Sequence, residues 1–204
     1  MIGVIDYGAG NLQSVCKALR FIGCEVKVAG SPRELAACRG VVLPGVGSFG
    51  DAMEHLRAKG FDEAIRRWIA ADKPFLGICL GMQVLFADSE ESPGTEGLHI
   101  FEGRFRKFPP DMGQKVPHIG WNSLRIEEDG GLFRGIEPEP YVYFVHSYYL
   151  LAGEPIISAR ADYGISFDAA VQKGNTWACQ FHPEKSGETG LAMLRNFGNL
   201  CGEE

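Results

Sequence analysis

Four short apolar segments, each followed by a loop and then by a helical pattern, dominate the first 87 residues. They are Ile2 to Ile5, Glu25 to Val28, Gly40 to Leu43 and Pro74 to Ile78. Strands that alternate with helices are joined by right-handed crossovers, which place the strands parallel in one sheet. Uniformly apolar strands fit such a sheet because helices bury both of its faces. The sequence therefore predicts an α/β fold with an open, mainly parallel sheet and helices on both faces.

The segments between these strands carry helical signals. Apolar residues recur at helical spacing from Leu12 to Ile22. The sequence SPRE at residues 31–34 is a capping box with proline at the first helical position, so a short helix should begin there. Residues 51–72 predict one long or two consecutive helices, and Leu80 to Ala87 predict the helix that follows the fourth strand.

Strand patterns predominate from residue 104 to residue 180. The expected strands are Ser123 to Glu127, Tyr141 to Leu151, Ile156 to Ala161, Ala169 to Gln172 and Thr176 to Phe181. The last two are joined by Gly174-Asn175, a pair that favours a tight hairpin turn. These strands should add antiparallel pairs to the parallel core.

The last predicted element is a helix from Gly187 to Leu200. Leu191, Leu194, Phe197 and Leu200 would form its apolar stripe. The chain contains no repeat, low-complexity stretch or linker. We therefore expect one domain that spans residues 1–204.

Charge and hydropathy exclude several classes of protein. There are 20 Lys and Arg residues against 26 Asp and Glu residues, a net charge of −6, which disfavours nucleic-acid binding. The longest runs without a charged residue have 14 residues, shorter than the ~18 of a membrane-spanning helix. The opening MIGVIDYG has an acid at Asp6 and no basic region, unlike a signal peptide. We expect a soluble, cytoplasmic protein.

The six cysteines are not expected to form disulfides or a metal site. The chain is long, carries no export signal and has no CxxC or Cys-x-His spacing. Most of these thiols should be small buried side chains. Cys79 has different surroundings.

Cys79 lies where a parallel sheet places its functional loops, beyond the carboxyl end of a strand. Gly77-Ile78-Cys79-Leu80-Gly81 is the nucleophile-elbow pattern with sulfur in place of oxygen. The flanking glycines permit a strained turn, and the N–H groups of the following helix would stabilise a thiolate. The alternative is that Cys79 is only a small residue in a tight turn.

His182-Pro183-Glu184 offers a base with its own acid. Proline keeps His182 extended, so His182 and Glu184 share a face. A thiol nucleophile requires such an oriented base, although a surface turn is the alternative interpretation. Cys79, His182 and Glu184 are thus the predicted catalytic residues.

The other four histidines are assigned no catalytic role. His55 and His99 are expected to be solvated. His118 and His146 lie in aromatic segments and are expected to make structural hydrogen bonds.

The loop from Gly45 to Gly50 matches G-x-G-x-x-G, the dinucleotide-binding pattern. The match is weak because the loop follows the third strand and no acidic residue follows a next strand at the required distance. Such a loop can also supply a backbone N–H to an oxyanion hole, with the N–H of Leu80 as the second donor.

Six segments resemble the class I (triad) glutamine amidotransferases across essentially the whole chain. Within that class the chain is similar to the glutaminase subunits of imidazole glycerol phosphate synthase, from histidine biosynthesis. The segments are IDYGAGNL (5–12), LPGVG (43–47), GICLGMQ (77–83), PHIGWN (117–122), YFVHSYY (143–149) and FHPEKSG (181–187). PGVG, HIGWN and FVHSYY are the discriminating ones, and LHIFEG (98–103) departs from the family pattern.

The resemblance implies a flavodoxin-like fold and hydrolysis of L-glutamine to glutamate and ammonia. Cys79 would attack the carboxamide, His182 would protonate the leaving ammonia and Glu184 would orient His182. The residues implied at the oxyanion and substrate contacts are Gly45, Val46, Gly47, Leu80, Gln83, Ser147 and Tyr148. No metal or cofactor is implied.

The resemblance also implies a partner. Glutaminases of this family deliver ammonia to a (β/α)8-barrel cyclase subunit in a heterodimer, and the cyclase makes imidazole glycerol phosphate and aminoimidazole carboxamide ribotide. Asn11, Trp121, Tyr143 and Lys185 are the implied partner contacts. The alternatives are that Trp121 and Tyr143 are core aromatics and that Lys185 is a solvated charge.

Other functions remain open from the residues alone. The elbow suits another class I amidotransferase or a stand-alone cysteine hydrolase of small amides. A non-enzymatic dinucleotide-binding or redox-sensing module would use the 45–50 loop and Cys79.

Overall fold

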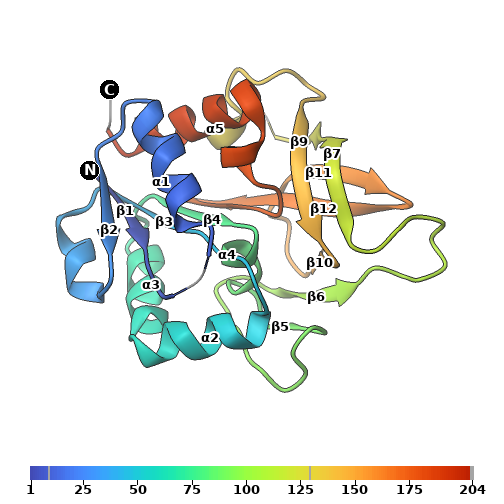
Figure 1. Cartoon of the computed structure of the whole chain (residues 1–204), viewed down its shortest axis with the longest axis horizontal. Helices are drawn as coiled ribbons and strands as arrows, with labels where there is room; N and C mark the ends of the chain where they lie inside the picture. Colours follow the sequence, from blue (N-terminus) through green and yellow to red (C-terminus); the bar gives the residue numbers. More distant parts are fainter. Residues whose placement is uncertain (9, 129, 203–204) are drawn as a thin grey trace.

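The computed structural model describes residues 1–8, 10–128 and 130–202, so Ala9 of the first glycine loop lies outside the described residues. Four strands form the parallel half of its main sheet: β1 (Ile2–Ile5), β2 (Val26–Ala29), β3 (Gly40–Leu43) and β4 (Phe75–Ile78). They lie in the order β2-β1-β3-β4 and every pair is parallel (Figure 1). The predicted parallel core is confirmed.

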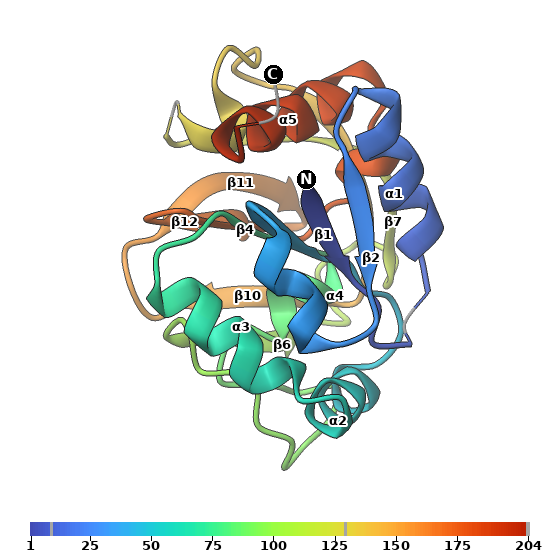
Figure 2. The same ribbon diagram turned by 90° about the vertical axis from the view of Figure 1, so that its left-hand side faces the viewer.

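Helices cover both faces of this sheet. On one face lie α1 (Leu12–Phe21) and α5 (Gly187–Leu200), and on the other lie η1 (Pro32–Ala37), α2 (Phe49–Ala58) and α3 (Phe61–Ala70) (Figure 2). Neighbouring strand residues point to opposite faces, so Val4 packs beneath α1 and α5 whereas Ile5 packs against the α2 and α3 side. Among the described helices, none has both the length and the apolar character needed to cross a membrane.

The helix boundaries follow local signals. The predicted capping box at Ser31 and Glu34 is present at the start of η1. Residues 51–72 form two helices, because Gly60 adopts a left-handed conformation with φ of +71° between α2 and α3.

The buried face of α5 differs from the predicted stripe. Leu200 is 41% exposed and Leu191 is only partly buried, while Gly190, Met193, Leu194 and Phe197 face the core. The helix approaches the preceding turn so closely that a Cβ on Gly190 would lie 1.9 Å from the carbonyl oxygen of Pro183. This close approach sets the rotation of the helix, and hydrophobicity alone did not reveal it.

The second half of the chain extends the sheet. The strands are β5 (Asp88–Ser89), β6 (Gly103–Lys107), β8 (Arg125–Ile126), β10 (Tyr148–Ala152), β11 (Ile157–Tyr163), β12 (Ile165–Lys173) and β13 (Thr176–Cys179). β13 pairs parallel with β4, and the order continues as β13-β12-β10-β6-β5, with β11 pairing with β12 and β8. The predicted hairpin at Gly174-Asn175 joins β12 to β13 in antiparallel pairing.

Two predicted strands are each divided in the structure, and a third, Ala169 to Gln172, is shorter than the observed β12. Tyr141 to Leu151 is not one strand but two, because β9 (Tyr141–His146) pairs with β7 (His118–Ser123) in a separate two-stranded sheet while β10 belongs to the main sheet. The break falls at Ser147, whose carbonyl oxygen accepts from the N–H of Phe108 at 3.0 Å. Ser123 to Glu127 likewise divides between the end of β7 and β8. A remaining short helix, η2 (Gly131–Phe133), packs against α5.

Candidate active site

Cys79 stands on a strained turn between β4 and α4 (Leu80–Gln83). Its φ and ψ are +54° and −109°, a conformation that residues with a Cβ rarely adopt. The flanking glycines are required by close packing, since a Cβ on Gly77 would lie 2.6 Å from the carbonyl oxygen of Gly81. A Cβ on Gly81 would lie 1.9 Å from the carbonyl oxygen of Leu43. The predicted strained elbow is therefore present.

The helix after Cys79 is shorter than the predicted Leu80 to Ala87. α4 has only four residues. The helical pattern stops because the N–H groups of Leu85 and Phe86 bond only three residues back, to Met82 and Gln83, and the N–H of Ala87 bonds to the carbonyl oxygen of Gly103. Local N–H groups, rather than a long helix dipole, are thus what this turn can offer to a thiolate.

His182 and Glu184 meet at the end of the adjacent strand. His182 is extended, with φ −106° and ψ 95°, and its Nδ1 lies 2.7 Å from Glu184 Oε1. Both side chains are fully buried. Pro183 begins a short 3₁₀ turn, η3 (Pro183–Lys185), which carries Glu184 back beneath the ring. The structure therefore brings together the base and the acid that the sequence predicts.

Asn11 supports this pair from another segment. Its Nδ2 donates to Glu184 Oε1 at 2.6 Å and lies 3.4 Å from His182 Nδ1. Asn11 precedes α1 in a left-handed conformation with φ of +70°. Its contact is with Glu184, and the sequence did not predict this contact.

The electrostatics of His182 favour its protonated form. Burial lowers the pKa of His182, but the neighbouring Cys79 and Glu184 together raise it, to about 9. Nε2 of His182 is buried without a hydrogen-bond partner in the described part of the protein. The imidazole can thus hold a proton at neutral pH beside the Cys79 sulfur.

A cavity of about 460 Å³ opens beside Cys79. It is lined by Val46, Gly47, Cys79, Leu80, Gln83, Glu91, Pro117, Val145, His146, Ser147, Tyr148 and Lys185. Six of the seven predicted oxyanion and substrate residues lie on this wall. Gly45 lies outside the lining, where its Cα packs so tightly that a Cβ would sit 2.3 Å from the hydroxyl of Tyr7.

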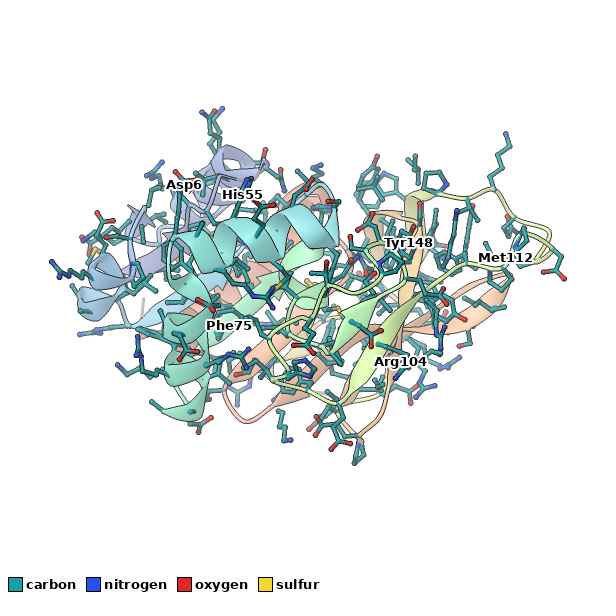
Figure 3. All side chains as sticks on the ribbon, turned by 90° about the horizontal axis from the view of Figure 1, so that it is seen from below. Asp6, His55, Phe75, Arg104, Met112 and Tyr148 are labelled. Atoms are coloured by element: carbon teal, nitrogen blue, oxygen red, sulfur yellow. The ribbon has the colours of Figure 1, made fainter. Side chains whose placement is uncertain are left out.

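Tyr148 marks the position of this cavity in the molecule. In Figure 3 it lies between the helical half, marked by Asp6 and His55, and the strand-rich end, marked by Met112. Substrate would therefore enter at the junction of the parallel core and the added strands.

A larger hollow of about 670 Å³ lies elsewhere, around Ile100 and Leu151. None of the described residues that line it is a cysteine, and its Lys173 and Glu154 side chains already form an ion pair at 2.5 Å. The nucleophile therefore identifies the smaller cavity as the candidate site.

Two residues of the site were missed in the sequence. Glu91 lines the cavity, and its Oε2 accepts from the N–H of Phe49 at 2.7 Å, which caps the start of α2. Gln180 is 1% exposed and its Nε2 lies 3.6 Å from the Cys79 sulfur. No sequence signal marks Glu91, whereas Gln180 stands two residues before His182, a predicted catalytic residue.

The other histidines match their predicted roles. His55 and His99 are exposed. His118 Nδ1 and His146 Nε2 are 3.0 Å apart, and burial lowers the pKa values of these two groups to about 4 and about 3. Because His146 Nδ1 donates to the carbonyl oxygen of Tyr148, its Nε2 accepts from His118. This neutral pair ties β7 to the cavity wall.

The predicted partner residues form a surface cluster, apart from Asn11. Trp121 is 55% exposed and meets Tyr143 edge to face, with ring centroids 6.2 Å apart. Lys185 Nζ lies 6.0 Å from the centre of the Tyr143 ring. Trp121 is therefore not a core aromatic.

All six cysteines are free and buried. Within the described ranges, no group of three or more His, Cys, Asp or Glu side chains is arranged to hold a metal ion.

The fold and this constellation define a class of enzyme. The family model described as "Glutamine amidotransferase class-I" matches residues 3–200, and the chain belongs to that family. A solved structure described as "Crystal structure of glutamine amidotransferase" shares the fold, with a TM-score of 0.77, 98% of each chain covered and 22% identity.

The subfamily follows from closer relatives. The chain is 50% identical to "Imidazole glycerol phosphate synthase subunit HisH" of Desulfitobacterium hafniense (strain DSM 10664 / DCB-2), over 100% of this chain and 96% of the relative. It is 52% identical to the subunit of the same name from Methanothermobacter thermautotrophicus, over 97% of each chain. The chain is thus a glutamine amidotransferase of the HisH family.

Proposed function

We propose that this chain, acting as one amidotransferase domain over residues 1–204, is a cytoplasmic glutaminase subunit of histidine biosynthesis. It hydrolyses L-glutamine to glutamate and ammonia and passes the ammonia to the cyclase subunit of imidazole glycerol phosphate synthase. The observation that carries the proposal is the buried His182–Glu184 pair, 2.7 Å apart, at the Cys79 elbow.

The first half-reaction forms a thioester. The Cys79 thiolate attacks the side-chain carboxamide carbon, and the electron pair of the C=O bond moves to oxygen, which accepts from backbone N–H groups of Gly47 and Leu80. When the tetrahedral intermediate collapses, the C–N bond breaks and the His182 imidazolium gives its proton to the leaving nitrogen. Ammonia leaves, and His182 is neutral.

The second half-reaction restores the ion pair. Neutral His182, oriented by Glu184, takes a proton from water as the water oxygen bonds to the thioester carbon. The C–S bond then breaks, glutamate is released, and the Cys79 thiolate again faces an imidazolium. The raised pKa of His182 suits this cycle because the ring is protonated before the reaction and can give that proton to the departing amide nitrogen.

The cavity wall suits the other end of glutamine. Glu91 is the acidic side chain among the described lining residues, so we assign it to the α-ammonium group. Backbone groups at Ser147 and Tyr148, where the chain passes from β9 to β10, would bind the α-carboxylate. Gln83, on the same wall, would contact the substrate amide or its α-groups.

The partner surface extends from the cluster of Trp121, Tyr143 and Lys185. Ile119 and Tyr141, on the same two-stranded sheet, are 59% and 61% exposed. Large apolar side chains that gather on one exposed face mark protein-binding surfaces. We assign this face to the barrel-shaped cyclase. Asn11, the remaining cyclase contact that the resemblance implies, donates to Glu184 of the triad.

The test is ammonia release from glutamine, with and without the barrel cyclase and its ribotide ligand. The wild-type chain should release ammonia faster with the liganded cyclase, and Cys79→Ala should release none. Turnover of small amides that no cyclase stimulates would instead support a stand-alone hydrolase. Binding of a nicotinamide or flavin nucleotide would support the dinucleotide module.

A further inference from the structure

Gln180 is a fully buried amide at the end of β13. It is 1% exposed, and its backbone N–H bonds to the carbonyl oxygen of Ala169 at 2.9 Å. Burying an amide side chain is costly unless both of its polar ends find partners. The partners of Gln180 therefore indicate why an amide stands here.

Both ends of this amide are engaged. Its Oε1 accepts from Gln83 Nε2 at 3.2 Å, and its Nε2 donates to Cys79 Sγ at 3.6 Å. Because the oxygen end is held by a donor, the NH₂ end must face the sulfur. Gln83 is itself almost fully buried on the cavity wall.

We propose that Gln180 is a positioning residue for the Cys79 sulfur, which it holds beside His182 and stabilises as a thiolate. The inference rests on the proposed function, in which Cys79 is the nucleophile. The sulfur carries negative charge twice in the cycle, before it attacks and again when the thioester breaks. His182 exchanges its proton between these steps, whereas the amide N–H of Gln180 is neutral and remains a donor throughout.

The position of Gln180 suits this role. β13 pairs parallel with β4, and the N–H of Cys79 bonds to the carbonyl oxygen of Cys179 at 2.8 Å. Gln180 is the next residue along, so its side chain is anchored to the same backbone ladder that carries the nucleophile. A donor held this rigidly needs no reorganisation when charge develops on the sulfur.

The test is the pH profile of Cys79 alkylation by iodoacetamide, read by mass spectrometry of the Cys79 peptide with Cys79→Ala as the blank. Gln180→Leu keeps a similar volume but removes the donor. At about pH 7 its alkylation rate should fall about tenfold, since a hydrogen bond to a charged group is lost. At about pH 10, where thiols are largely ionised, its rate should approach that of the wild type.

Two further variants sharpen the result. Gln180→Glu keeps the shape but places a carboxylate beside the sulfur, so its rate at about pH 7 should fall at least as far as that of Gln180→Leu. Gln172→Leu is the matched control, because Gln172 is a partly buried glutamine on the neighbouring strand β12 whose Oε1 has no partner in the described structure. It should keep the wild-type profile.

Glutaminase kinetics with the cyclase complete the test. Gln180→Glu, which keeps the oxygen that accepts from Gln83, should lower kcat while KM for glutamine stays within about twofold of the wild type. A wild-type alkylation profile in both Gln180 variants would overturn the role of Gln180 even if Cys79→Ala is inactive. Full glutaminase activity in Cys79→Ala would instead overturn the proposed function itself.

Discussion

The buried His182 imidazolium should couple the stability of this protein to pH. Burial lowers the pKa of His182, but Cys79 and Glu184 raise it further, from the ordinary 6.5 to about 9. A rise of that size corresponds to about 3 kcal/mol of preferential stabilisation of the protonated ring. Because the folded pKa lies above the unfolded one, this contribution is fully present below about pH 6.5 and is lost as the pH rises through about 9.

The perturbation that isolates this contribution is His182→Gln, which keeps a polar side chain but cannot titrate. Urea unfolding of both proteins at about pH 6 and about pH 10 gives the change in unfolding free energy for each. The wild type should lose about 3 kcal/mol more than the variant across this range. Titrating groups that do not interact with His182 are common to both proteins, so their contributions cancel in the difference.

NMR titration of the ring provides a second measurement. The His182 signal should have its midpoint near 9, and the midpoint should fall in Cys79→Ala because the negative sulfur is gone. An equal loss of stability in wild type and His182→Gln, together with a ring that titrates at or below 6.5, would refute the reasoning.

Three further predictions test the elbow, the triad and the partner surface. Gly81→Ala should lower the free energy of unfolding in urea by more than about 3 kcal/mol, because its Cβ would lie 1.9 Å from the carbonyl oxygen of Leu43. Gly30→Ala, whose Cβ would lie 3.7 Å from its nearest atom, should change the free energy of unfolding by less than about 1 kcal/mol. In the ammonia-release assay Glu184→Gln should lose less activity than His182→Ala, because a misoriented base remains a base; the reverse order would contradict the assigned roles. Trp121→Ala should weaken cyclase binding in calorimetry at least about tenfold without changing the unfolding temperature, and unchanged affinity would remove this residue from the interface.

The parts of the fold that were predicted correctly depend on local chemistry. Each N-terminal strand is a short apolar run bounded by a loop, and the capping box at Ser31 and Glu34 fixes the start of η1 through residues three apart. The strained turn at Cys79 was predictable for the same reason, since the glycines that permit it are its immediate neighbours. The extended His182 follows from the proline after it.

The errors arise where distant backbone competes for hydrogen bonds. The helix predicted for Leu80 to Ala87 ends early because the N–H of Ala87, which would close its last turn, donates instead to the carbonyl oxygen of Gly103. The strand predicted for Tyr141 to Leu151 is divided at Ser147 because β9 pairs with β7 in one sheet whereas β10 pairs with β6 in the other. The backbone groups that form these bonds are distant in sequence, so no local pattern predicts them.

The same limit hides the contact that completes the site. No sequence pattern predicts that β13 lies beside β4. This parallel pairing places Cys179 opposite Ile78. As a result, residues 180–184, which follow β13, lie next to Cys79, which follows β4. The nucleophile, its base and the amide at Gln180 therefore stand at neighbouring ends of two paired central strands, joined by the bond from the Cys79 N–H to Cys179.

That arrangement separates a rigid part of the site from an adjustable one. Local stability is highest in central strands and lowest in loops. Cys79 and His182 follow central strands, whereas Val46 and Gly47 lie in the loop between β3 and α2. Glu91 holds the end of this loop, because its carboxylate accepts from the N–H of Phe49 at the start of α2. A partner that alters turnover would therefore act on the oxyanion loop and the wall at Glu91 more readily than on the spacing of Cys79 and His182.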